Sequence, residues 1–186
     1  MILSVFPVPR AVLLQRCGLS WIATLALLPV LSAAAETSPS IGLQLGHGRG
    51  DYQRAGVIWD SGPLWQRELA SGRQLQLAME LGFARWQASD PHRQHAWQAS
   101  AIPMLRWWPN AHLFIEAGVG PTVFDTTRVG GRRISTAFQF GDHLGIGLQV
   151  AERHSVSLRY SHYSNASIKK PNPGLDLLQL SWRVEY

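Results

Sequence analysis

Alternation of apolar and polar positions dominates most of the chain. Apolar side chains recur at every second residue with Gly, Gln, Ser, Glu or Arg between them, which is the period of a β-strand. Leu75 and Leu77, for example, alternate with Gln76 and Ala78. The pattern predicts eight strands, centred on residues 41–46, 55–59, 75–84, 97–107, 113–119, 138–150, 155–161 and 178–186.

The composition of the two strand faces indicates a membrane barrel. One face carries large apolar side chains, and the other is rich in glycine and poor in Lys and Asp. Charged residues make up 16% of the chain, against about 25% in an average soluble protein. A soluble barrel of the lipocalin type is the alternative, but it would need a charged exterior. The predicted fold class is therefore all-β, an eight-stranded antiparallel transmembrane β-barrel of the bacterial outer membrane.

Aromatic residues near the predicted strand ends agree with this fold. Trp and Tyr gather at the two interfaces of a membrane, where they form girdles around a barrel. The chain also stops on an aromatic residue at the end of an alternating strand, as bacterial outer-membrane barrels do. The residues concerned are Trp59, Trp86, Trp97, Trp107, Trp108, Trp182 and Tyr186.

The first 35 residues have the organisation of a cleaved secretory signal peptide. Arg10 and Arg16 precede an apolar run over 19–31, and Ser-Ala-Ala-Ala follows at 32–35. The run is shorter than the roughly 18 residues of a membrane helix. We therefore expect residues 1–35 to be removed and 36–186 to form the barrel, with a retained anchor as the alternative. Cleavage would also remove the one cysteine, Cys17.

Loop lengths predict how the barrel sits in the membrane. Outer-membrane barrels have short periplasmic turns and longer extracellular loops. Turns at 109–110 and 152–153 are short, and an even number of strands places both termini in the periplasm. The segment 60–72 is the exception, a long periplasmic connection expected to hold a short helix. The longer, extracellular loops are 46–53, 87–95, 121–135 and 165–174.

Polar residues interrupt the lipid-facing side at the extracellular end of the last two strands. The apolar positions of 156–160 face lipid, so His162 and Ser164 share that face, as Asp176 does with Leu178. Ionisable groups on a lipid face are costly and indicate function. A His can act as base for a Ser hydroxyl while a carboxylate orients the imidazole. The other interpretation is a solvated loop rim above the membrane.

A second carboxylate competes for the same place. Asp142 has lipid-facing parity on the sixth strand, and the turn at 152–153 places it close to opposite His162. Asp142 is then the orienting acid, a second polar support, or a group turned away by a bulge.

These residues resemble a known enzyme family. The matching residues are His162-Tyr163-Ser164-Asn165-Ala166, Lys169, Pro171-Asn172 and Gly174-Leu175-Asp176. They are similar to the active-site segment of the PagL lipid A 3-O-deacylases, closely over the C-terminal third of the chain and elsewhere through barrel pattern and length. The resemblance implies an outer-membrane esterase that hydrolyses the 3-hydroxyacyl chain at the 3-position of lipid A.

The family's motif assigns roles to particular residues. Its His and Ser are two residues apart and its acid follows the His by fourteen, which implies a triad of Ser164, His162 and Asp176. The family's acid is often Glu, and the spacing favours Asp176 over Asp142. Phe140 falls where the family carries a Phe beside its site.

The resemblance also bears on the surroundings of the triad. Asn172 falls where the family carries an Asn beside its site. The candidates for the oxyanion site are backbone N–H groups near Asn165 to Ser167 and the side chain of Asn172. Lys169 and Lys170 flank the site, where they could contact the phosphate of lipid A.

The expected partners follow from this function. Lipid A, or lipopolysaccharide, of the outer leaflet is the substrate. The route needs no metal or cofactor, and the spread of the +5 net charge argues against nucleic acid. The sequence leaves open whether the protein forms a homodimer. The alternative functions are a non-catalytic barrel, acting as an adhesin or structural protein, and a lipid-modifying acyltransferase.

Overall fold

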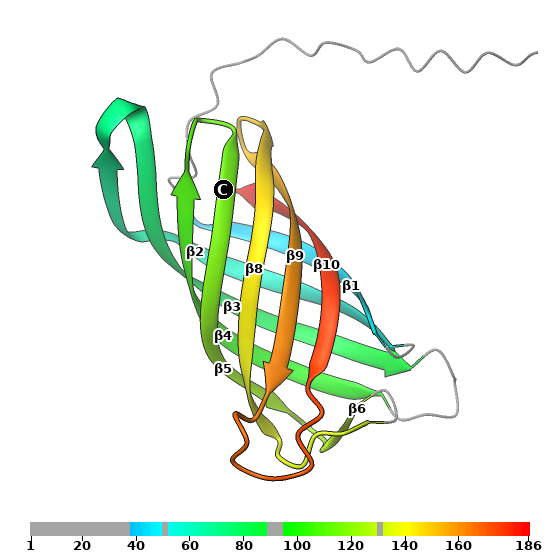
Figure 1. The fold of residues 1–186 in the computed structure, drawn as a ribbon. Coiled ribbons are helices and arrows are strands. Elements are labelled where there is room, and N and C mark those ends of the chain that lie inside the picture. Colours follow the sequence, from blue (N-terminus) through cyan, green and yellow to red (C-terminus); the bar gives the residue numbers. More distant parts are fainter. Residues whose placement is uncertain (1–37, 50–51, 89–94, 130–131) are drawn as a thin grey trace, which may run out of the picture.

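The computed structural model describes residues 38–49, 52–88, 95–129 and 132–186 (Figure 1). Short elements accompany the barrel strands: the 3₁₀ turn η1 (Ala70–Gly72) and a small hairpin of β6 (Arg128–Val129) and β7 (Arg132–Arg133). The signal peptide expected at 1–35 lies outside the described residues. The long strands are β1 (Ser40–Gly48), β2 (Tyr52–Leu69), β3 (Arg73–Ala88), β4 (Ala96–Trp108), β5 (Leu113–Phe124), β8 (Phe138–Ala151), β9 (His154–Ser164) and β10 (Leu175–Glu185).

These eight strands close into one barrel. Each strand pairs antiparallel with its neighbour along the chain, in the order β1-β10-β9-β8-β5-β4-β3-β2. Pairing of β1 with β10, with Ile41 opposite Val184, joins the first strand to the last. Closure joins the sheet edges of the described barrel, so each of its eight strands has a neighbouring strand on both sides. The predicted all-β, eight-stranded antiparallel barrel is therefore confirmed.

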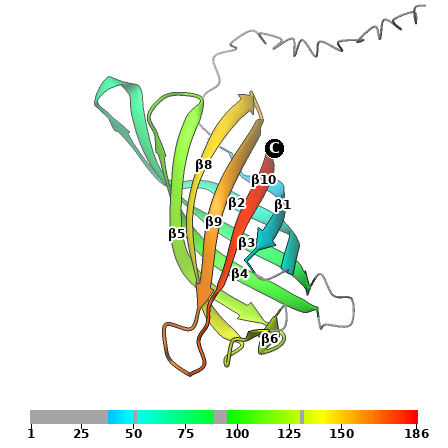
Figure 2. The same ribbon diagram turned by 45° about the vertical axis from the view of Figure 1, so that its right-hand side comes forward.

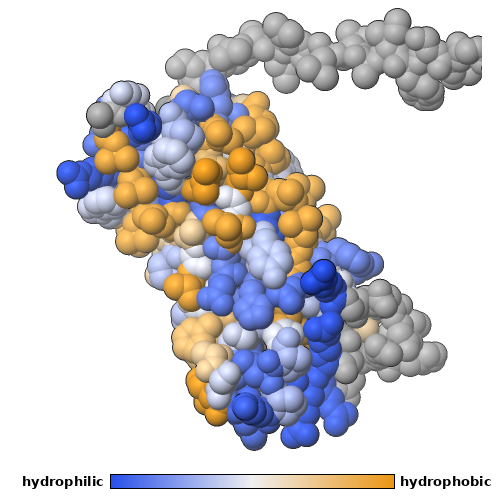
Figure 3. All heavy atoms as spheres, in the orientation of Figure 1, coloured by the Kyte–Doolittle hydropathy of each residue, from blue (hydrophilic) through white to orange (hydrophobic). Residues whose placement is uncertain are grey.

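The barrel wall is apolar outside and polar inside. Leu45 on the outer face is 63% exposed, whereas Arg159 on the inner face is 0% exposed. A soluble barrel would need the reverse arrangement, so the lipocalin-like alternative is wrong. In the view of Figure 3, hydrophilic residues gather toward the lower end of the molecule, and hydrophobic residues predominate on the wall above it. The described residues contain no helix long and apolar enough to cross a membrane.

Paired charges fill the barrel interior. Arg159 donates through Nη1 and Nη2 to the two carboxylate oxygens of Glu80, at 2.7 and 2.9 Å, and through Nε to Glu116 Oε1 at 3.0 Å. Arg183 Nη1 donates to the other oxygen of Glu116 at 3.3 Å. Buried charges persist in proteins when they are paired and hydrogen-bonded in this way. The lumen is therefore a packed polar core, and chemistry must take place on the outer wall or at an end.

The two ends of the barrel differ in the length of their connections. One end, which we name the turn end, has the short connections 109–112 and 152–153 and the chain end at Tyr186. At the other, the loop end, β1, β3, β5 and β9 end, and the connection 165–174 lies there, as Figure 2 shows in part. The loop predicted at 46–53 is shorter than expected, because β1 extends to Gly48 and β2 begins at Tyr52.

The segment 60–72 differs most from its prediction. Residues up to Leu69 continue β2, and the expected short helix is the three-residue turn η1. The β2–β3 hairpin reaches past the turn end and leans away from the wall (Figures 1 and 2). Register shifts between Asp60 and Pro63 and between Pro63 and Trp65 mark β-bulges. Bulges bend a strand and accommodate a proline inside it, which is why the sequence alone indicated a break here.

Candidate active site

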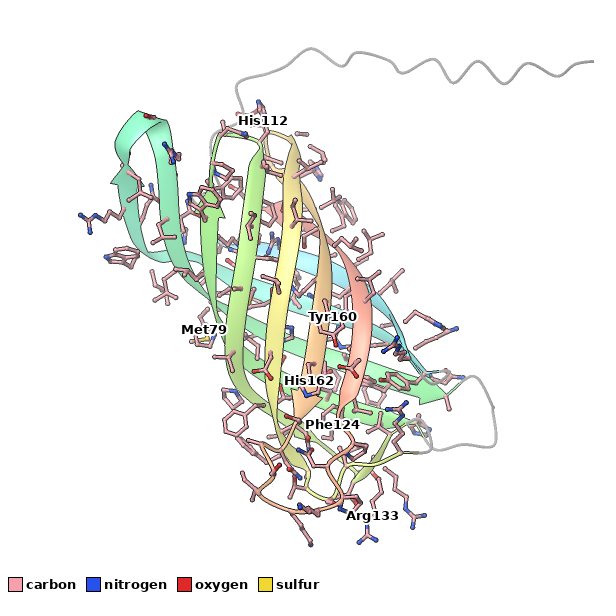
Figure 4. The ribbon with its side chains drawn as sticks, in the orientation of Figure 1. Met79, His112, Phe124, Arg133, Tyr160 and His162 are labelled. Atoms are coloured by element: carbon pink, nitrogen blue, oxygen red, sulfur yellow. The ribbon has the colours of Figure 1, made fainter. Side chains whose placement is uncertain are left out.

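The predicted polar cluster lies on the outer wall where β9 and β10 approach the loop end. In the β9–β10 ladder Asp176 stands directly opposite His162. On the other side of β9, Phe140 is opposite Ser164 and Asp142 is opposite His162. Figure 4 shows the labelled Tyr160 and His162 following one another along β9. The structure thus brings together residues that arrive from three consecutive barrel strands.

His162 and Asp176 are hydrogen-bonded. Their Nδ1 and Oδ1 atoms are 2.7 Å apart, and the side chains are 38% and 29% exposed. Directly paired residues of antiparallel strands hold their Cβ atoms about 4.5–5.5 Å apart, so an aspartate reaches the ring without the extra methylene of a glutamate. When Nδ1 carries the proton donated to Asp176, Nε2 of the neutral imidazole is the acceptor. That nitrogen can remove a proton from a nearby hydroxyl.

Ser164 follows His162 by two residues on the same face of β9. Its side chain is half-buried and makes no hydrogen bond to any residue that the structure describes. Contacts between a nucleophile and its base are often long in a free enzyme and tighten when substrate binds. Ser164 therefore presents a hydroxyl on the same outer face as the imidazole, two residues further along β9.

Asp142 lies across the ladder from His162 but has a different environment. Its side chain is exposed and forms no hydrogen bond within the described part of the chain. Of the two carboxylates that flank His162 in register, Asp176 is the one that contacts a ring nitrogen. Phe140, opposite Ser164, packs edge-on against Phe138, with ring centroids 5.0 Å apart.

Gly174 packs against the imidazole. Its φ is +66°, a left-handed backbone conformation that glycine adopts readily. A Cβ at this position would lie 2.5 Å from His162 Cε1, which is far inside van der Waals contact. The backbone just before β10 is thus a wall against which the His162 ring rests. Sequence reasoning included Gly174 in a motif but had no signal for this contact.

The loop 165–174 is held by Asn165. The buried Asn165 side chain donates through Nδ2 to the carbonyl of Lys169 at 2.8 Å and to that of Ile134 at 3.3 Å. Its backbone N–H donates to Asn172 Oδ1 at 3.2 Å. With Asn172 Oδ1 accepting this bond, the side-chain amide N–H groups of Asn172 are the donors that it offers to other partners. Ala166 and Ser167 follow in left-handed conformations, with φ of 50° and 65°.

Two tyrosines that the sequence assigned no role in the site contact Asp176. Tyr160 Oη donates to Asp176 Oδ1 at 2.7 Å, and Tyr52 Oη donates to the backbone carbonyl of Asp176 at 2.8 Å. The alternation of strand positions placed Tyr160 on the same face as His162. A tyrosine on that face equally fits the aromatic girdle at a membrane interface. Tyr52 was outside the strands recognised in the sequence.

Cations surround the site at the loop end. Lys169 and Lys170 are exposed on the loop that follows Ser164. On the other side, a groove of about 470 Å³ runs from Asp176 on β10 toward β1. Arg49 is one cation of this groove. Arg132 Nη2 donates to the backbone carbonyl of Arg49 at 2.9 Å, so the Arg132 guanidinium is a second cation beside the groove. The groove is lined by His47, Gly48, Arg49, Tyr160, Asp176, Leu177 and Leu178.

Nothing in the described ranges is arranged as a metal centre. Three or more His, Cys, Asp or Glu side chains do not gather there in a way that could hold an ion. The chemistry that the described side chains offer is that of a hydroxyl, an imidazole and a carboxylate.

Comparison with known proteins shows which family this chain resembles. The family described as Lipid A 3-O-deacylase (PagL) matches residues 51–185. Lipid A deacylase PagL of Bordetella bronchiseptica is 44% identical over 163 residues, which cover 86% of this chain and 92% of the relative. The protein of the same name from Pseudomonas aeruginosa is 32% identical over 169 residues, covering 89% and 95%.

Solved structures agree with the sequence comparison. A crystal structure of the outer membrane enzyme PagL superposes with a TM-score of 0.71 at 25% identity, covering 79% of this chain and 99% of that one. The N-terminal β-barrel domain of Pseudomonas aeruginosa OprF gives a TM-score of 0.54 at 11% identity, covering 81% and 98%. At that identity the second likeness concerns the barrel fold alone.

Proposed function

Because the chain belongs to the PagL family of lipid A 3-O-deacylases, we propose that it is a serine esterase of the bacterial outer membrane. Its reaction is hydrolysis of the ester that links the 3-hydroxyacyl chain to the 3-position of lipid A. The observation that carries this proposal is the 2.7 Å bond from His162 Nδ1 to Asp176 Oδ1, with Ser164 two residues along the same outward face.

The proposed reaction begins with attack by Ser164. Nε2 of His162 removes the hydroxyl proton as Oγ bonds to the ester carbonyl carbon, and Asp176 stabilises the resulting imidazolium. Collapse of the tetrahedral intermediate breaks the bond to the sugar oxygen, which takes the proton from His162. Water, deprotonated by His162, then cleaves the acyl-enzyme. The products are a 3-hydroxy fatty acid and lipid A lacking one chain.

The oxyanion of the intermediate needs hydrogen-bond donors. Loss of one such donor typically slows an enzyme by about 10²–10³-fold. The backbone N–H groups of Ala166 and Ser167 and the side-chain amide of Asn172 are the donors we assign. The backbone N–H of Asn165 is already bonded to Asn172 Oδ1, so its part is to orient that amide.

The place of the site accounts for access. Long loops face the cell exterior in outer-membrane barrels, so the loop end of this barrel is extracellular and the site lies at the depth of the outer leaflet. Lipid A in that leaflet meets Ser164 from the side. All three catalytic side chains come from β9 and β10, so one copy of the chain suffices.

Cations on both sides of the site suit the anionic headgroup of lipid A. We assign phosphate contacts to Lys169 and Lys170 on the loop after Ser164. The sugar lies in the groove that Arg49 lines on the other side of Asp176. Charge-assisted contacts of this kind orient a phosphate without taking part in the chemistry.

Mass spectrometry of lipid A tests the proposal. Cells that make the wild-type protein and cells that make Ser164→Ala are compared at equal amounts of folded barrel. Loss of one 3-hydroxyacyl chain from the 3-position with wild type only is the expected result. Unchanged lipid A in both, also with detergent-solubilised protein, would point to a non-catalytic barrel, and a chain transferred to another acceptor would indicate an acyltransferase.

A further inference from the structure

Asp176 Oδ1 accepts two hydrogen bonds of equal length. His162 Nδ1 and Tyr160 Oη each lie 2.7 Å from this one oxygen. Oδ2 of Asp176 has no hydrogen-bond donor among the described residues. The phenol is therefore part of what fixes the carboxylate at the position where it meets the imidazole.

The ladder register explains why a tyrosine can do this. Asp176 is directly opposite His162, and the next outward pair along the strands is Leu178 and Tyr160. Tyr160 is thus the diagonal neighbour of Asp176, at about 7–8 Å between backbones, within reach of a long aromatic side chain. A shorter polar side chain at 160 would not bridge this distance.

Aromatic residues are common at membrane interfaces without any part in catalysis. Tyr186 is such a residue and can be compared with Tyr160. Tyr186 is 63% exposed at the turn end, and its hydroxyl accepts a hydrogen bond from Trp59 Nε1 at 2.9 Å. Tyr160 is 51% exposed but donates its hydroxyl proton to a carboxylate. Charge-assisted bonds are stronger than neutral ones, and more so where lipid lowers the local dielectric constant.

We propose that Tyr160 is a positioning residue for ester hydrolysis. It holds the Asp176 carboxylate in the one orientation in which Oδ1 receives the His162 Nδ1 proton. The phenol brings no charge, so the carboxylate remains free to stabilise the imidazolium. Without the phenol, the Asp176 carboxylate keeps one hydrogen-bond donor among the described residues, His162, and turns toward solvent or lipid headgroups. This inference rests on the proposed function and adds a fourth side chain to its site.

The test uses Tyr160→Phe, which removes the hydroxyl and keeps the ring. Tyr186→Phe is the matched control, because it also removes a hydrogen-bonded phenol from the outer wall, at the opposite end. Steady-state hydrolysis of purified lipid A is measured with full-length protein in detergent micelles. We expect kcat of Tyr160→Phe to fall about ten- to a hundredfold with KM unchanged, and Tyr186→Phe to match wild type.

A double-mutant comparison separates positioning from other roles. In an Asp176→Ala background, Tyr160→Phe should cause no additional loss, because its partner is already absent. An equal loss in both backgrounds, or a rise in KM, would overturn the inference in favour of substrate contact. Wild-type activity in Tyr160→Phe would leave the residue as an interface aromatic. Failure of the proposed function is distinct, since wild type itself would then release no 3-hydroxy fatty acid, or release would persist in Ser164→Ala.

Discussion

Asp176 stands directly opposite His162 in the β9–β10 ladder, with its Oδ1 2.7 Å from His162 Nδ1. Because the two residues are paired in the ladder, the number of residues between them along the chain is linked to the strand register of the barrel. A register shift of one residue would turn Asp176 toward the packed lumen, because neighbouring strand positions face opposite sides. The loop 165–174 therefore has to join its strands without changing their register.

The two carboxylates beside His162 should differ sharply in importance. Asp176→Asn removes the acceptor for the Nδ1 proton, and we expect kcat to fall by about 10²–10⁴-fold, as it does in hydrolases with a Ser-His-Asp triad. Asp142→Asn alters an exposed side chain that forms no hydrogen bond to a described residue, so its kcat should stay within about threefold of wild type. Kinetics on lipid A in detergent compare the two. The reverse ranking would assign the orienting role to Asp142.

Gly174→Ala tests the contact with the imidazole. The new methyl group would lie 2.5 Å from His162 Cε1 at a residue with φ of +66°. We expect activity to fall at least about tenfold, because small displacements of catalytic groups are costly. Gly72→Ala is the control, since its φ is +72° and nothing lies within 4 Å of the added Cβ. If both variants lost activity equally, backbone strain rather than the ring contact would be responsible.

Asn165→Ala tests the support of the loop 165–174, which lies beside the proposed active site. The change removes the side-chain donor to the Lys169 carbonyl, at a cost of about 1–3 kcal/mol if that carbonyl stays buried. The Ile134 carbonyl keeps the Thr136 N–H and Gln139 Nε2 as donors. We expect faster proteolysis within 165–174 and a reduced kcat in an otherwise intact barrel. Asn110→Ala removes a comparable cap, whose Oδ1 accepts the His112 and Leu113 N–H groups at the turn end. Equal proteolysis of the active-site loop in both variants would contradict a local role for Asn165.

Strand parity predicted the fold and the face of the candidate site because both depend on a period of two. Once 156–160 faces lipid, His162 must follow, whatever the loops do. Contacts that depend on the path of a loop could not be obtained in this way. Gly174 meets the imidazole because of its left-handed backbone, and the bond from Tyr160 to Asp176 depends on rotamers. Parity alone could not separate Tyr160 from an ordinary interface aromatic.

The β2–β3 hairpin is an element that the sequence alone did not predict correctly. Gly62 and Pro63 indicate a break between elements, as such residues usually do. In the barrel, Gly62 adopts a φ of +68° and the neighbouring bulges absorb the proline, so β2 continues to Leu69. A bulge depends on the partner strand, which the local sequence does not specify.

The central claim is that Ser164 is a nucleophile activated by His162 and Asp176. Labelling of the folded barrel with a fluorophosphonate, followed by peptide mass spectrometry, tests it most directly, because the reagent phosphonylates activated serines. We predict one adduct, on Ser164, absent in His162→Asn, much slower in Asp176→Asn and unchanged in Asp142→Asn. An adduct on a different residue, or labelling of Ser164 at the wild-type rate in His162→Asn, would contradict the claim.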